Sequence, residues 1–364
     1  MRIVHVAESE IGMTGGMARV GWYWQQAFEK RGHTFIHIGR ENVGAHKHIR
    51  QFPKAALHYY KKIARAEDIL LVHEPTAGKF ARNAFETIVV SHGLERRCWR
   101  LQTGRKHLDS PKPSLKTRLL FPIWRLRGCD HGLRHACGAL LINQEDKEFA
   151  ESYYGIKSDA ILVFKNGVHW FPESPPLSQE NANNILFSGT WLARKGIHTL
   201  ARVAENLHQR GLILNWILAG TGLPAEQVSQ IWPASLSACT KIIRKFSEKE
   251  ETELYRQCNL FVLPSFFEGQ PLSLLQAMAH VRCCITTNVC GQKDIIKHRH
   301  NGLMFEPGDA STLADLIAEA TQDLPLQTNL GDNARRSITG RHWDAAASEV
   351  VDFVEQIHLK RQRV

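Results

Sequence analysis

Residues 263–279 combine the groups that a phosphate and the hydroxyls beside it require. In this segment, LPSFFEGQPLSLLQAMA, a short apolar run reaches Pro264, an acid and a glycine follow, and a helical pattern opens near Pro271. Proline is well tolerated in a first helical turn. The free N–H groups at a helix start bind phosphate. Glu268 can hydrogen-bond hydroxyls on one side of that phosphate, and Gln276 can reach a ribose on the other. An ordinary capping acid would give the same short pattern.

The segment resembles the signature of the large family-four retaining glycosyltransferases of the GT-B fold. Their mark is an acid, seven residues and a second acid, in a P-S-x-x-E-G…E-A-M context. Glu268 matches the first acid, Gln276 replaces the second, and Ala277-Met278 matches. Glutamine keeps the hydrogen bonds but loses the charge. The resemblance implies transfer of a hexose-type sugar from a nucleotide-sugar donor with retention, and no cofactor. The donor residues implied here are Glu268, Gly269, Gln270, Pro271, Leu272 and Gln276.

Flanking segments extend the resemblance. Residues 188–196, SGTWLARKG, are similar to the family's G-R-x…K-G segment, whose lysine neutralises the donor pyrophosphate. Lys195 fits that role, which suits a compact charge, and Gly189 is the first glycine. Thr190 stands where the family usually has arginine, and whether Arg194 substitutes for it is open. The resemblance implies that Lys195 is catalytic and that Gly189 and Arg194 contact the donor.

Further downstream and upstream, shorter matches occur. Residues 290–296, CGQKDII, resemble a G-G-x-x-E segment, with Gly291 at the second glycine and Asp294 for the acid. Residues 301–309 are also similar to the family, as is Asn166-Gly167-Val168 at the end of the first domain. Base recognition in this fold is often made by backbone groups, which we expect near Lys245 and Phe246.

The N-terminal half shows a sparser match. Gly15 and Gly16 follow the first predicted strand, where the family has a glycine loop against the donor phosphate and the acceptor. A tight turn alone would also use such glycines. His92, in the segment SHGLE, resembles the family's histidine beside the transferred sugar, and the resemblance implies a catalytic role. Taken alone, a single histidine is as well explained by a structural role.

Alternating strands and helices place these residues on two parallel sheets. The predicted strands are 3–7, 34–38, 69–73, 87–91, 139–142, 161–164, 185–188, 214–218, 260–263 and 283–286. We therefore predict an α/β protein with two Rossmann-like doubly wound domains facing a cleft, with ligands at the carboxyl ends of the strands. The expected divisions are an acceptor-side domain at 1–170, a linker at 171–184, a nucleotide-sugar domain at 185–342, and a final helix at 343–364 that packs back on the first domain.

Composition restricts the class of protein. The 364 residues suffice for two domains at roughly 150 residues each, and 43% hydrophobic residues can bury a sizeable core. The eight cysteines form no C-x-x-C pair, as expected for free thiols in a reducing compartment. The chain starts as a strand, and no apolar run reaches the length of a membrane span. We therefore expect a cytoplasmic protein that meets a membrane only at its inner face, if at all.

A basic stretch runs from Arg82 to Arg134, with twelve Lys and Arg against four Asp and Glu. Such a field attracts phosphates, nucleic acid or an anionic membrane. Basic and apolar side chains alternate around Trp124, so we expect residues 96–134 to meet an anionic membrane surface and a glycan or lipid-linked acceptor. A packed helix surface explains the pattern equally well. The stretch contains no recognisable nucleic-acid motif, and we expect no nucleic-acid partner.

No two aspartates are separated by one residue, so we expect stabilisation of the leaving diphosphate by Lys195 and backbone amides, without a metal.

Two other functions remain open. A non-catalytic nucleotide-sugar-binding subunit would have the same fold, with Thr190 and Gln276 in place of charged residues. A dinucleotide oxidoreductase fits less well, because no G-x-G-x-x-G follows the first predicted strand.

Overall fold

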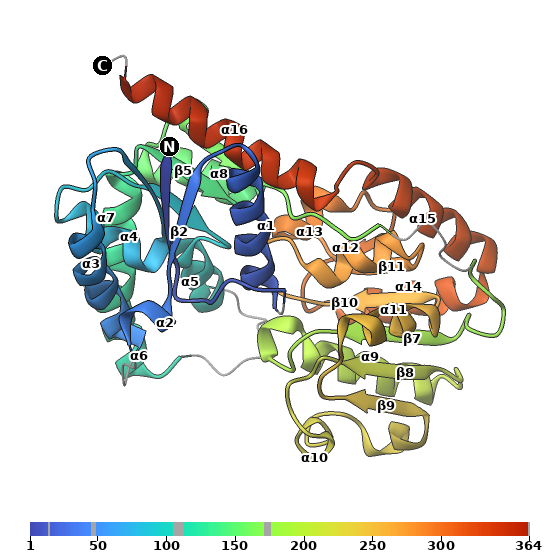
Figure 1. Ribbon diagram of the computed structural model, residues 1–364. Helices are drawn as coiled ribbons and strands as arrows, with labels where there is room; N and C mark the ends of the chain where they lie inside the picture. Colours follow the sequence, from blue (N-terminus) through green and yellow to red (C-terminus); the bar gives the residue numbers. More distant parts are fainter. Residues whose placement is uncertain (14, 45–48, 105–112, 171–175, 363–364) are drawn as a thin grey trace. The chain divides into compact units, whose positions relative to one another are not determined.

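The computed structural model describes residues 1–13, 15–44, 49–104, 113–170 and 176–362 (Figure 1). Backbone contacts divide the chain into two compact units. The first holds the described residues up to Gly167 and those from Trp343 onward, and the second holds 168–342. The unit boundary therefore precedes the predicted linker. Of that linker, 171–175 lie outside the described residues, and the rest folds onto the second unit, where Asn259 donates to the Ser178 carbonyl at 2.8 Å.

The first unit is built on a parallel six-stranded sheet in the order β2-β1-β3-β4-β5-β6. Its strands are β1 Arg2–Val6, β2 Thr34–Ile38, β3 Asp68–His73, β4 Ile88–Ser91, β5 Gly138–Leu141 and β6 Ile161–Val163. β1, β4 and β5 are buried along their whole length. Short apolar runs become such strands because helices cover both faces of a parallel sheet.

The helices of this unit connect successive strands. They are α1 Gly16–Lys30, α2 Arg40–Val43, α3 Phe52–Ile63, α4 Glu74–Ala81, α5 Glu95–Gly104, α6 Leu115–Phe121, α7 Arg127–Arg134 and α8 Gln144–Phe149, with single π-turns at Pro122–Leu126 and Ala150–Tyr154. The last helix of the chain, α16 Trp343–Gln362, also belongs to this unit and lies beside α1 (Figure 1). Tyr23 of α1 stacks on Trp343 with 4.5 Å between ring centroids. Arg31, the C-cap residue of α1, forms an ion pair with Glu355 at 3.0 Å.

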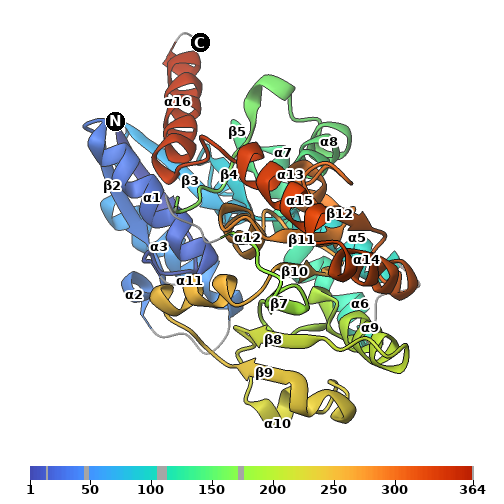
Figure 2. The same ribbon diagram turned by 90° about the vertical axis from the view of Figure 1, so that its right-hand side faces the viewer.

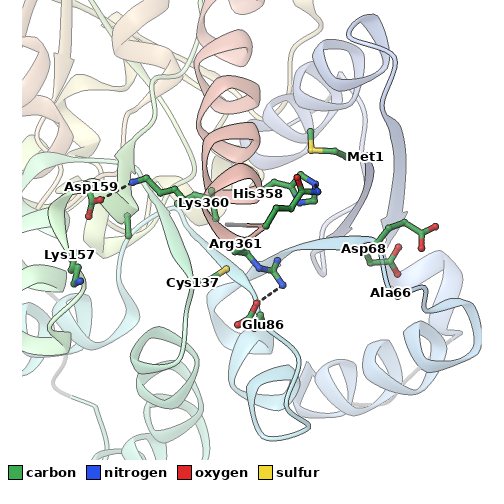
Figure 3. Close-up of a pocket in the computed structure, with 14 residues that line it drawn as sticks. Met1, Ala66, Asp68, Glu86, Cys137, Lys157, Asp159, His358, Lys360 and Arg361 are labelled. Atoms are coloured by element: carbon green, nitrogen blue, oxygen red, sulfur yellow. Dashed lines mark hydrogen bonds and ion pairs between the residues drawn. The ribbon is translucent and has the colours of Figure 1, made fainter. Parts of the chain in front are cut away.

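The far end of α16 is fastened at the amino ends of the strands (Figure 3). Lys360 pairs with Asp159 at 2.8 Å, and Arg361 pairs with Glu86. These residues line a hollow of about 990 Å³. Ligands of parallel sheets bind at the opposite, carboxyl edge, and both cations are already neutralised, so we assign this hollow to the docking of α16.

The second unit is built on another parallel six-stranded sheet, in the order β12-β11-β10-β7-β8-β9 (Figure 2). Its strands are β7 Asn184–Ser188, β8 Asn215–Ala219, β9 Thr240–Ile243, β10 Leu260–Leu263, β11 Cys283–Thr287 and β12 Leu303–Phe305. β9 and β12 are absent from the sequence prediction. Both are edge strands of three or four residues, and β9 is nowhere fully buried, so neither carries the continuous apolar run of an inner strand.

Helices cover this sheet as well. They are α9 Ile197–Gln209, α10 Ala225–Val228, α11 Glu248–Arg256, α12 Leu272–Ala279, α13 Cys290–Ile295, α14 Ala310–Gln322 and α15 Leu324–Ser337. The buried core includes three cysteines, Cys258, Cys283 and Cys284. All eight cysteines of the chain are free thiols.

Each sheet reverses its strand order at one place. In the first unit the reversal lies between β1 and β3, and in the second between β7 and β10. At such a switch point the two connecting chains leave in opposite directions, so a crevice opens at the carboxyl ends of the strands, where ligands bind. The loops after β1, β3, β7 and β10 are therefore the places to look for a site.

Candidate functional site

The loops after β7 and β10 bring an ion pair to the switch point of the second unit. Lys195 ends a 3₁₀ turn, Ala193–Lys195, in the β7 loop, and Glu268 lies in the β10 loop. The Lys195 Nζ lies 2.5 Å from Glu268 Oε1, and both side chains are 10% exposed. The Arg194 guanidinium lies 3.2 Å from the same oxygen and is 45% exposed. Two residues 73 positions apart in sequence are thus in direct contact.

The charges of this cluster do not cancel. Burial would raise the pKa of Glu268, but the charges of Lys195 and Arg194 hold it below its ordinary value. The carboxyl group is therefore ionised at neutral pH. Two cations against one carboxylate leave a net positive charge, and Arg194 is the more exposed cation. The cluster therefore favours an anion near Arg194 and Lys195.

The start of α12 adds N–H groups beside this cluster. Pro271 is the N-cap residue of α12, and no side chain caps the helix. Leu272 begins the helix, four residues after Glu268. Unpaired N–H groups and the positive end of the helix dipole both attract an anion. The predicted segment thus supplies a positive helix end next to the Lys195–Glu268 pair.

Close packing fixes the backbone of the β10 loop. The Gly291 amide donates to the Glu268 carbonyl at 3.2 Å. A Cβ atom on Gly291 would lie 1.4 Å from the Gly269 carbonyl oxygen. Only glycine permits this approach. The Gln270 Oε1 accepts a hydrogen bond from Arg341 at 3.0 Å, which holds the next residue of the loop.

The remaining predicted donor residues of this unit also lie at carboxyl ends of strands or on α12. Gly189 follows β7, and a Cβ atom there would lie 3.6 Å from the Lys195 Cε. Phe246, after β9, lies close to Gly220 after β8, while Lys245 is exposed. Gln276 is 3% exposed on α12, and its Oε1 has no hydrogen-bond partner among the described residues.

In the first unit, His92 lies in the loop between β4 and α5. Two buried carboxyl groups, those of Glu74 and Asp146, hold this loop by hydrogen bonds. Glu74 accepts from the Ser91 hydroxyl at 2.7 Å and from the Glu95 amide at 3.1 Å. Asp146 accepts from the Leu94 amide at 3.3 Å. Burial and the neighbouring Glu95 raise the pKa of Glu74 to about 8. Glu74 is therefore mostly neutral at pH 7.

His92 lines a pocket of about 330 Å³ together with His73, Glu74 and Met17. Met17 is in the first turn of α1, which starts at Gly16, with Gly15 as its N-cap. Gly15 has φ +90°, which favours glycine. The structure thus places the predicted glycine loop and His92 at the same edge of the first sheet. Glu74 and His73 are missing from the sequence prediction, although both directly follow or end a strand.

Three buried histidines of this unit resist protonation. Burial, aided by neighbouring imidazoles, lowers the pKa of His5 and His73 well below its ordinary value, and burial lowers that of His92 to about 4. The unfolded chain takes up these protons as the pH falls through about 6.5. The folded chain takes them up only at lower pH. Stability is therefore complete above pH 6.5 and is lost as the pH falls.

The variant His92→Gln removes one of these titrating groups, so its comparison with the wild type measures the contribution of His92 to the pH dependence of stability. Relative to the variant, the wild type should lose about 1.4 kcal/mol of unfolding free energy per pH unit between pH 6.5 and 4. Urea unfolding at several pH values measures this difference. His58→Gln, on the exposed side of α3, is the control and should track the wild type. A constant difference between His92→Gln and the wild type would contradict the prediction.

The chain is similar in sequence to known glycosyltransferases over the segment that contains the Lys195–Glu268 cluster. The family model of the glycosyl transferases group 1 matches residues 172–337. The match covers nearly the whole second unit, including Lys195 and Glu268. The amylovoran biosynthesis glycosyltransferase of Erwinia amylovora is 27% identical over 312 residues, 79% of this chain and 68% of that protein. An Escherichia coli galactosyltransferase, named for UDP-Gal and GlcNAc-diphosphoundecaprenol, is 21% identical over 55% of this chain and 54% of its own length.

Across the first four curated relatives, the match spans 54% to 68% of the relative's length. Among solved structures, sucrose-phosphate synthase from Thermosynechococcus elongatus superposes with a TM-score of 0.77 over 99% of this chain and 100% of its own, at 17% identity. That likeness shows the fold. The two parallel six-stranded units have the α/β GT-B fold, as the sequence predicts.

Proposed function

We propose that the protein is a glycosyltransferase. It moves a hexose-type sugar from a nucleotide-sugar donor to a glycan or lipid-linked acceptor, with retention of configuration, in the synthesis of a cell-surface polysaccharide or lipopolysaccharide. The observation that carries the proposal is the Lys195–Arg194–Glu268 cluster beside the uncapped start of α12. The group 1 match over the same residues supports it.

The chemistry follows from the charge of this cluster. Glycosyl transfer breaks the bond between the sugar and a diphosphate, so negative charge develops on the leaving phosphate oxygen. Preorganised cations and N–H groups stabilise such charge most effectively in a partly dry site. Lys195, Arg194 and the α12 amides supply these groups, and we propose that no metal is needed. When the diphosphate of the donor binds Lys195, the ion pair between Lys195 and Glu268 weakens. The Glu268 carboxylate can then accept hydrogen bonds from hydroxyls of the sugar.

A donor screen tests this proposal. We expect one member of a panel of UDP-, GDP- and ADP-sugars, at about 100 times its dissociation constant, to raise the unfolding temperature by about 5 °C or more. Turnover of that donor, unchanged by EDTA, should follow on addition of an acceptor glycan or polyprenyl-linked sugar. No stabilisation by any member would contradict the proposal.

A non-catalytic nucleotide-sugar-binding subunit is the second candidate. One observation favours it: Gln276 replaces the acid of the related signature, and its buried Oε1 lacks a partner among the described residues. Both candidates predict donor binding. Transfer or hydrolysis of the bound donor by the purified protein separates them, because only the enzyme turns the donor over.

We also propose that the protein is cytoplasmic and that α6 meets an anionic membrane surface. Leu115, Leu119 and Ile123 are 71%, 62% and 64% exposed, and the basic residues Lys116 and Arg118 lie among them. Residues 105–112 of the predicted basic stretch lie outside the described residues. Three arginines of that stretch are instead paired with acids: Arg96 with Asp130, Arg97 with Asp146 and Arg125 with Glu95. No helix of the described chain is long and apolar enough to cross a bilayer.

Vesicle sedimentation tests this contact. Vesicles containing phosphatidylglycerol should retain the protein at low salt, and phosphatidylcholine vesicles should not. The double variant Leu119→Ser, Ile123→Ser should lose retention. Ile213→Ser removes an even more exposed apolar residue, 83% exposed, of the second unit and should leave retention unchanged. Equal sedimentation with both lipids, or in the double variant, would contradict the proposal.

A further inference from the structure

Three histidines from neighbouring strands form a hydrogen-bonded chain in the first unit. His5 of β1 pairs in register with His37 of β2. His73 ends β3 immediately after Val72, which pairs with Val6. The three side chains therefore lie on one face of the sheet. His5 Nδ1 lies 3.1 Å from His37 Nδ1, and His5 Nε2 lies 3.0 Å from His73 Nε2. The described residues contain no group of three or more side chains arranged to hold a metal.

The backbone carbonyl of Ser9 determines which nitrogen donates in each hydrogen bond of this chain, and this order of donors is its direction. His37 Nε2 lies 3.0 Å from the Ser9 oxygen, and Glu41 Oε1 lies 3.6 Å from the same nitrogen. Both oxygens only accept, so His37 must carry its proton on Nε2. In a neutral ring Nδ1 then accepts, so His5 donates from Nδ1 and accepts at Nε2. His73 must therefore donate from Nε2, which leaves its Nδ1 unprotonated.

The alternative direction requires an extra proton. If His37 carried protons on both nitrogens, it would donate to His5, and every following tautomer would reverse. Burial lowers the pKa of His37, and lowers those of His5 and His73 further. The neutral chain with the first direction is therefore the state at pH 7.5.

His73 connects this chain to the pocket that contains His92. Both residues line the pocket, and their ring centroids are 5.4 Å apart. His73 is the N-cap residue of α4, but its side chain makes no capping hydrogen bond. Its Nδ1 has no hydrogen-bond partner among the described residues. His73 therefore brings an acceptor lone pair to the lining of this pocket.

The other polar groups of the pocket are neutral or paired. Glu74 is mostly protonated at pH 7. Arg125 is bound by Glu95, and Glu8 by Arg40. Such a lining suits an uncharged ligand that carries hydroxyl donors, and does not favour an anion.

We propose that His73 Nδ1 accepts a hydrogen bond from a hydroxyl of the acceptor sugar, and that the chain through His5 and His37 to the Ser9 carbonyl keeps it unprotonated for this role. The assignment of the ligand rests on the proposed function. The tautomers do not, because they follow from the three hydrogen bonds of a chain of neutral imidazoles. His5 and His37 are thus positioning residues that act through His73.

Nitrogen-detected imidazole spectra of the full chain at pH 7.5 test the tautomers directly. We expect protonated Nε2 on His73 and His37 and protonated Nδ1 on His5. The variant His37→Phe removes the fixed end, so His73 should become a mixture of the two tautomers. His58→Phe, on the exposed side of α3, should leave the His73 signals unchanged. A wild-type His73 protonated at Nδ1, or a His73 that His37→Phe does not change, would overturn the inference.

Kinetics then test the ligand, with a saturated donor found by the screen above. His37→Phe should raise the acceptor KM about twofold, because a mixture of the two tautomers leaves His73 Nδ1 unprotonated in only about half of the molecules, and should leave the donor KM unchanged. An unchanged acceptor KM would overturn the role of His73 toward the acceptor. If no donor is turned over, the proposed function fails, while the tautomers remain readable from the spectra.

Discussion

Replacing Lys195 by Met should reduce sugar transfer by about 10²- to 10³-fold, as the loss of one preorganised donor to a developing negative charge does elsewhere. The substitution keeps the length of the side chain and removes its charge. It also leaves Glu268, a buried carboxylate, with the half-exposed Arg194 as the remaining cation of the cluster. Breaking a buried pair in this way should lower the unfolding free energy by about 3 kcal/mol.

The loss of activity and the loss of stability can be separated. In the double variant Lys195→Met, Glu268→Gln no uncompensated charge is buried, so most of the stability should return. Transfer should stay as low as in the single variant, because the cation remains absent. Lys293→Met, in α13, removes a lysine outside the cluster and should be close to wild type. A double variant that recovered transfer would show that Lys195 only supports the fold.

Replacing Gly291 by Ala should abolish donor binding and destabilise the second unit by several kcal/mol. The new Cβ would lie 1.4 Å from the Gly269 oxygen, well inside van der Waals contact. Backbone must move to relieve that overlap, and overpacking of this kind costs about 1–3 kcal/mol or more. The part that moves carries Glu268 and the start of α12. Urea unfolding and the donor-induced shift of the unfolding temperature measure the two effects.

Two glycines provide controls for this prediction. A Cβ on Gly128 meets no atom within 4 Å, and one on Gly189 makes only ordinary contact with Lys195. We expect Gly128→Ala to behave as wild type, and Gly189→Ala to keep its stability even though it lies beside the cluster. Donor binding by Gly291→Ala with wild-type affinity would mean that the β10 loop tolerates a shift.

Much of the fold can be predicted from the sequence because buried parallel strands are continuous apolar runs. The doubly wound α/β prediction is confirmed, and all ten predicted strands agree with the structure to within one residue at either end. The two unpredicted strands, β9 and β12, lie at sheet edges. β9 mixes threonine and lysine with two isoleucines, a pattern that a loop can also have. Pairing with β8 makes it a strand, and local sequence does not encode that pairing.

The two candidate sites differ in how far the sequence predicts them. Lys195 and Glu268 each stand in a distinctive segment, and the structure places their side chains in contact. The histidine chain has no such segment. His37 and His73 lie 32 and 68 residues after His5 in the sequence, and only the register of three strands brings the three rings together. No sequence motif marks Glu74 either. Its raised pKa comes from burial and from the nearby Glu95, and both arise only in the folded chain.

The chain order of the two units has a consequence for synthesis. The described residues of the second unit are continuous in sequence, whereas the first unit needs α16, which is synthesised only after the second unit. Until Trp343 and the apolar side chains that follow it emerge, Tyr23 and its side of α1 have no cover. The first unit can therefore complete its packing only after the second unit has been synthesised, and a chain terminated before α16 leaves an exposed apolar surface on α1 that favours aggregation.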